Sequence, residues 1–182
     1  GNAGKLFYNF YYKLRSYHFL YKYLSADSLA FNPHSLEHYL GGRVSFQYDS
    51  MNVVSGWAEY MKEGNYRIEG QLNTILLDVS VKQLLSKPGF VQNAYRGSYS
   101  YWNNNFRNVQ FTQGSAFLKA KLGPLFISPG ATYTLYKNYI YFKQGSFAET
   151  DQTVLPVQSS GMQELLSPEL RVEFRVVRHL YL

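Results

Sequence analysis

The sequence of 182 residues contains no cysteine. This absence excludes a disulfide framework and any metal or redox site built on cysteine ligands. Charged residues make up only 16% of the chain, well below the roughly 25% of ordinary soluble domains. No segment approaches the ~18 consecutive apolar residues of a membrane helix. The composition therefore favours a membrane or interface protein, but not one that crosses the bilayer with helices.

Motifs of common enzymes and nucleic-acid-binding proteins are also missing. We find no Gly-x-Ser-x-Gly elbow and no phosphate-binding glycine loop. The net charge of +6 comes from scattered Lys and Arg, which gives no basic cluster for nucleic acid. The four histidines lack metal-ligand spacing; they are His18, His34, His38 and His179. We expect no catalytic activity, metal, cofactor or nucleic-acid partner, with an acid/base carboxylate pair at Glu69 and Glu173 as the alternative.

Aromatic residues are abundant, with 18 Tyr and 13 Phe, and they lie in short segments that alternate apolar with polar residues. The clearest alternation spans residues 66–72, 77–82 and 170–176. A period of two sends alternate side chains to opposite faces of a β-sheet. Full charges occupy the second face, so that face must meet water. Two all-β architectures fit this pattern, a soluble antiparallel barrel or sandwich and a transmembrane β-barrel.

We expect eight or nine strands of about ten residues, the length that suits tilted membrane strands of roughly 9 to 11 residues. Residues 1–182 are interpreted as a single β-barrel segment, part of a longer barrel. The pattern predicts a strand over residues 95–102 and a final strand over residues 169–181. It also predicts a bulge near Gly114 and a bend at Pro129. Residues 144–168 are expected to form a loop holding a short element around Met162.

Four local patterns between residues 63 and 158 carry a resemblance to a known family. They are the turn Glu63-Gly64-Asn65-Tyr66, the loop Lys87-Pro88-Gly89-Phe90, the segment YRGSYSYWNNNF at 95–106, and KNYIYF at 137–142 followed by Pro156-Val157-Gln158. In this order and spacing they resemble the putative porins of Bacteroidota. The chain departs from that family at Gly97-Ser98-Tyr99, where the family usually has Ser-Asn-aromatic.

The resemblance implies an antiparallel transmembrane β-barrel in a Gram-negative outer membrane. It implies passive passage of small hydrophilic solutes or ions, with outer-membrane lipid and lipopolysaccharide as surroundings. Two other interpretations stay open. One is a soluble β-barrel that binds a hydrophobic ligand or a partner, as a lipocalin does, and the other is the barrel of a TonB-dependent receptor.

The alternation assigns candidate residues to each face. In the pore interpretation, charged residues opposite the apolar positions face the lumen. These are Arg67, Glu69, Lys82, Lys119, Lys121, Arg171, Glu173 and Arg175. Aromatic residues toward strand ends are expected to form a girdle at the lipid–water boundary. These are Tyr17, Tyr21, Tyr99, Tyr101, Trp102, Tyr133, Tyr139 and Tyr141. The excess of Lys and Arg over Asp and Glu in the lumen set predicts a mild preference for anions.

Overall fold

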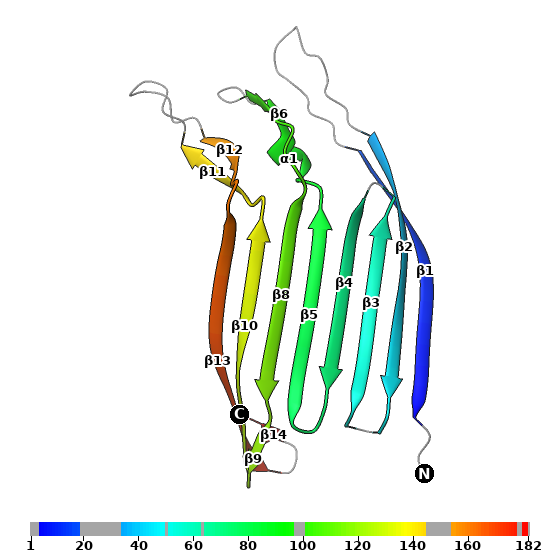
Figure 1. Ribbon diagram of the computed structural model, residues 1–182, viewed down its shortest axis with the longest axis vertical. Helices are drawn as coiled ribbons and strands as arrows, with labels where there is room; N and C mark the ends of the chain where they lie inside the picture. The colour runs from blue at the N-terminus through cyan, green and yellow to red at the C-terminus, as the bar shows by residue number, and fades with distance from the viewer. Residues whose placement is uncertain are drawn as a thin grey trace.

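A computed structural model describes residues 4–18, 34–49, 51–62, 64–96, 101–144, 154–177 and 180–181. One antiparallel sheet contains most of these residues, and its strands lie side by side in a single layer (Figure 1). Its long strands are β1 (Lys5–His18), β2 (His34–Gln47), β3 (Val53–Met61), β4 (Asn65–Asn73), β5 (Leu77–Ser86), β8 (Val109–Leu118), β10 (Leu125–Lys137) and β13 (Met162–Val177). The prediction of an all-β antiparallel fold is confirmed.

Each long strand pairs with the next long strand along the chain, so the sheet is a meander. The short β9 (Ala120–Leu122) pairs with β10, and β14 (Leu180–Tyr181) pairs with the end of β13. Within the described ranges the path of paired strands does not return to β1. The sheet is therefore open, and β1 has a strand neighbour on one side only.

The connections alternate in length along the meander. Turns at one end are short, as at residues 74–76 and 123–124, whereas residues 87–108 and 138–161 form long connections at the other end (Figure 1). The turn after β3 is the exception at that second end, where Gly64 adopts a φ of 86° that favours glycine. Short turns on one side and long loops on the other are typical of outer-membrane barrels.

Two small hairpins stand beyond the end of the sheet that carries the long connections. The first contains α1 (Phe90–Asn93), β6 (Ala94–Arg96) and β7 (Tyr101–Asn103), and the second contains β11 (Ile140–Gln144) and β12 (Val154–Gln158). The Gln158 side chain joins the second hairpin to the segment that follows the first. Gln158 Nε2 donates to the carbonyl oxygens of Arg107 and Asn138 at 2.7 and 3.0 Å. The predicted strand over residues 95–102 is thus wrong, because its two ends belong to β6 and β7.

Three further expectations about the strands are wrong. β8 pairs with both neighbours without a register shift, so there is no bulge at Gly114. β10 continues through Pro129 and pairs with β13 along its whole length. The last long strand begins at Met162, within the expected loop. The first error arises because Phe111 and Phe117 of β8 lie on the polar face, where aromatic residues hide the true register.

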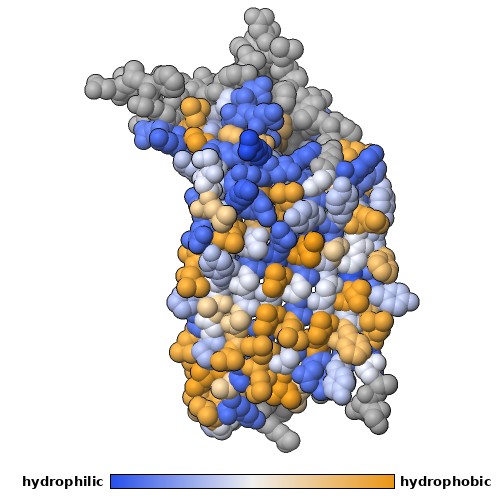
Figure 2. All heavy atoms as spheres, viewed as in Figure 1, coloured by the Kyte–Doolittle hydropathy of each residue, from blue (hydrophilic) through white to orange (hydrophobic). Residues whose placement is uncertain are grey.

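The two faces of the sheet differ in composition and in exposure. We name the apolar face by Leu6, Val44, Val54, Ile68, Val81, Leu118, Ile127 and Val172, which the strand registers place on one side, and we call the opposite side the polar face. Ile68 and Val81 on the apolar face are 50% and 54% exposed. Figure 2 shows apolar side chains gathered over the lower part of the strands, away from the long connections. No helix among the described residues is long and apolar enough to cross a bilayer.

Candidate functional site: the polar face and its pocket

The polar face carries the charged residues that the alternation assigned to a lumen. Glu69 pairs with Lys82 across β4 and β5, and Arg67 pairs with Glu59 across β4 and β3. On the same face, toward the β13 edge of the sheet, Phe126 of β10 pairs with both Lys121 of β9 and Glu173 of β13. Arg171 is on this face too, with its guanidinium 3.8 Å from the centre of the Phe117 ring. Lys119 donates from Nζ to Asn73 Oδ1 at 2.7 Å, and Arg175 pairs with Tyr181 in the register of β13 and β14.

Glu69 links the cations of β4 and β5. Arg67 donates from Nε and Nη2 to Glu69 Oε1 at 2.9 and 2.6 Å, and Lys82 Nζ lies 3.3 Å from the same oxygen. The Arg67 guanidinium also covers the Trp57 ring at 4.5 Å from its centroid. The planar guanidinium can pair with the carboxylate and stack on the ring at once. Arg67 is thereby held in one position on the polar face.

A second network joins β1 to β3. Glu59 Oε2 accepts hydrogen bonds from Tyr11 Oη and Lys13 Nζ, each at 2.8 Å. Trp57 Nε1 in turn donates to Tyr11 Oη at 3.0 Å. Room for Tyr11 exists because Gly41 lies beneath its ring, where an added Cβ would be 2.4 Å from Cζ. Two protein donors thus hold Oε2 of the Glu59 carboxylate.

A third network lies nearer the long connections. Glu37 Oε2 accepts from Arg15 Nε at 2.7 Å and from Tyr39 Oη at 2.6 Å. The Glu37 side chain is only 9% exposed, whereas that of Arg15 is 59% exposed. The acid is therefore enclosed and the base remains open to whatever occupies the polar face.

Small polar residues cross the polar face as one continuous row, the hydroxyl row, with charged residues on both sides of it; all of its members except Gln71 carry a hydroxyl. The row consists of Ser45, Ser55, Gln71, Ser80, Ser115, Thr132 and Ser167, each paired with the next in the strand registers. Ser80 Oγ and Ser115 Oγ lie 2.7 Å apart. None of these residues is apolar or charged, so the polar face offers neutral hydrogen-bonding groups as well as charges.

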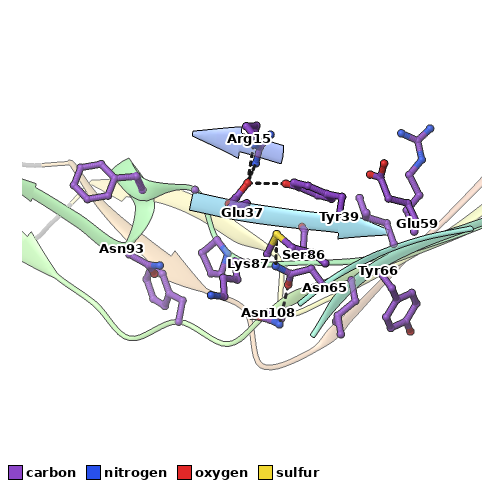
Figure 3. A pocket seen from close by; sticks show the side chains of 18 of the residues that line it. Arg15, Glu37, Tyr39, Glu59, Asn65, Tyr66, Ser86, Lys87, Asn93 and Asn108 are labelled. Atoms are coloured by element: carbon purple, nitrogen blue, oxygen red, sulfur yellow. Dashed lines mark hydrogen bonds and ion pairs between the residues drawn. The ribbon is translucent and has the colours of Figure 1, made fainter. Parts of the chain in front are cut away.

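A pocket of about 880 Å³ lies where the polar face meets the connection between β5 and β8. In Figure 3, Arg15, Glu37 and Tyr39 lie on one side of it, and Asn65 and Asn108 lie on the other. The connection is fixed to the sheet there, because Asn108 Nδ2 donates to Asn65 Oδ1 at 3.2 Å. Aromatic and amide residues complete the lining, including Phe106 and Asn93.

Among the expected girdle residues that are described, Tyr139 and Tyr141 stack with ring centroids 6.4 Å apart, and the rest lie in different parts of the molecule. Tyr133 is on the apolar face, whereas Tyr17 lies on the polar face and lines the pocket. Four others lie beyond the end of the sheet: Tyr101 and Trp102 in β7, Tyr139 just before β11, and Tyr141 in β11. Trp102 is anchored there by stacking on Tyr95 at 4.5 Å and by donating from Nε1 to the Val91 oxygen. Tyr21 and Tyr99 lie outside the described residues.

The sequence prediction missed the two networks on β1 and β2. Their signal was present, because the apolar residues at even positions of residues 6–14 place Lys13 and Arg15 on the opposite face. The pocket had no comparable signal, since its lining combines strand residues with a connection of irregular conformation. No group of three His, Asp or Glu side chains suited to a metal ion lies within the part of the chain that is described.

Comparison with known proteins gives a match to a family model. The family model described as "putative porin" matches residues 2–182, nearly the whole chain. No curated protein and no solved structure matches significantly.

Proposed function

Since the chain belongs to the putative porin family, we propose that it forms part of the wall of an outer-membrane β-barrel through which small hydrophilic solutes or ions diffuse passively. Membership of this family supports a porin-like outer-membrane function in general. The proposal adds that solutes pass passively and that charged residues line their path.

One structural observation carries the proposal. Large apolar side chains are exposed on one face of a single-layer sheet, while ion pairs and hydroxyls occupy the other. A soluble barrel of the lipocalin type points its apolar side chains inward, so Ile68, Leu72 and Val81 would be enclosed. Here they are exposed. A membrane barrel suits both faces, because lipid covers the apolar side chains and water contacts the polar side chains.

An open sheet edge cannot face hydrocarbon, because its backbone N–H and C=O groups would lack hydrogen-bond partners. The proposal therefore requires further strands beside β1 and β14 to complete the wall. In that wall, Lys and Arg on the polar face outnumber Asp and Glu. The described cations are Lys5, Lys13, Arg15, Arg43, Arg67, Lys82, Lys119, Lys121 and Arg171, and the acids are Glu37, Glu59, Glu69, Asp78, Glu169 and Glu173. An excess of lumenal cations favours anion passage.

Single-channel conductance of the full-length protein in a planar lipid bilayer tests the proposal. We expect steady open-channel steps and, under a salt gradient, a reversal potential that favours chloride. Glu69→Gln should increase the chloride preference, since it removes a negative charge from the polar face. The matched control is Glu164→Gln, on the apolar face opposite Leu135, which should leave the reversal potential unchanged. Absence of current from a protein shown to be folded and inserted would contradict a pore and favour a plugged receptor barrel.

A further inference from the structure

We propose that the pocket between the polar face and the β5–β8 connection binds a carboxylated sugar, such as a uronate, as a solute-selective site. This inference rests on the proposed function for the solute's route to the pocket. Its volume of about 880 Å³ lies within the roughly 300 to 1,000 Å³ of small-molecule sites. A monosaccharide or disaccharide fits in that space.

The charge that the pocket presents is basic, although both signs line it. Glu37 and Glu59 are each held by two protein donors and are nearly enclosed. The guanidinium groups of Arg15 and Arg67 are 59% and 41% exposed after making their ion pairs. Each uses Nε and Nη2 toward its carboxylate, which leaves Nη1 on both residues for a ligand. Guanidinium groups recognise carboxylates through such N–H donors.

The rest of the lining suits a polyhydroxylated ring. Asn93 Oδ1 is buried at the pocket and has no hydrogen-bond partner among the residues that the structure describes. An acceptor in that condition is costly unless a donor reaches it, and a sugar hydroxyl is such a donor. Phe106 adds aromatic surface, and the flat apolar face of such a ring suits the C–H side of a sugar ring. A simple inorganic anion would use the arginines and leave these groups unused.

Position strengthens the assignment. The pocket lies at the end of the sheet that carries the long connections (Figure 1), which in outer-membrane barrels is the extracellular side. A solute would therefore meet the pocket on entry, before it reaches the hydroxyl row further along the polar face.

Calorimetric titration of the full-length protein in detergent with glucuronate, with glucose as the neutral probe, tests this inference. We expect glucuronate to bind at least about tenfold more tightly than glucose, because only the acid carries a carboxylate that can pair with an arginine of the pocket. Arg67→Gln should weaken glucuronate binding about tenfold or more. Asn93→Asp, which lies outside the sheet and adds a repelling charge, should weaken it as well.

Arg171→Gln is the matched control, since Arg171 is exposed on the same face and paired with Glu169 at 2.6 Å, but does not line the pocket. It should leave the affinity for glucuronate unchanged. Equal affinities for glucose and glucuronate, or an equal loss in Arg171→Gln, would overturn the proposal. Open channels without glucuronate binding would refute this site and leave the pore intact, whereas binding without conductance would refute the pore and leave this site intact.

Discussion

The two faces of the sheet differ in exposure, and the apolar side chains are the more exposed. On β3 the apolar-face residues Val54 and Tyr60 are both 52% exposed, whereas Trp57 and Glu59 on the polar face are partly buried and hydrogen-bonded. A soluble antiparallel sheet buries its apolar face and solvates the other. The stability of this fold therefore depends on a medium other than water at the apolar face.

A second difference lies in packing. The polar face is crowded, as Gly41 and Gly130 show, where an added Cβ would come within 2.4 and 2.3 Å of neighbouring atoms. On the apolar face Gly70 and Gly114 have no atom within 4 Å of an added Cβ, whereas a Cβ at Gly42 of the same face would lie 2.7 Å from the Phe10 ring. Packing is therefore tight at Gly41 and Gly130 on the polar face and open around Gly70 and Gly114 on the apolar face.

The largest effect should come from reversing the polarity of the apolar face. We expect Ile68→Arg to lower the free energy of unfolding by about 2 to 4 kcal/mol, the cost of a charge near the middle of the lipid-facing band. Denaturant unfolding of the full-length protein in phospholipid vesicles measures it. Gln71→Arg, on the polar face of the same strand, is the control and should cost less than about 1 kcal/mol. Equal losses in both variants would contradict the assignment of the faces.

A smaller effect should come from filling space on the crowded face. Gly130→Ala places a Cβ 2.3 Å from the Ala116 carbonyl oxygen and from the Phe117 ring, so backbone or ring must move at a cost of about 1 to 3 kcal/mol. The same unfolding titration reports the loss. Gly70→Ala has open space around it and should be neutral or slightly stabilising. If Gly130→Ala were as stable as Gly70→Ala, the close packing around Gly130 would be contradicted.

The smallest effect concerns a short turn outside both faces. Asp49 accepts hydrogen bonds from the backbone N–H of Met51 and Asn52, each at 2.8 Å, and from the Asn52 side chain. The bond from Met51 is the main reason that the pKa of Asp49 lies below its usual value. A lowered folded pKa contributes stability above the unfolded pKa of about 3.9, and this is lost as the pH falls through the folded pKa.

We therefore expect Asp49→Asn to unfold at slightly lower temperature than the natural protein at pH 7. The difference should shrink below about pH 4 and disappear in stronger acid, where both side chains are neutral. Thermal unfolding across this pH range checks it. A difference that persisted at low pH would show that the charge of Asp49 is not the source of the effect.

Much of the fold could be predicted where apolar and polar residues alternate cleanly. The strands around Tyr66, Val79 and Val172 were predicted for that reason, and their charged residues lie together on the polar face. Prediction failed where aromatic residues occupy the polar face, as at Phe111 and Phe117 in β8. It also failed at residues 95–102, because a small hairpin outside the sheet has the same local alternation as a wall strand.

The sequence shows the two faces of the regularly alternating strands, because side-chain direction in a strand repeats every two residues and needs only local information. Tertiary structure alone decided which polar groups meet. Lys13 reaches Glu59, 46 residues away, only because the registers of β1, β2 and β3 align them. The pocket likewise requires Arg15 of β1 to lie near Asn108 of a distant connection. Such contacts depend on how paired strands and long connections fold together, which no local period specifies.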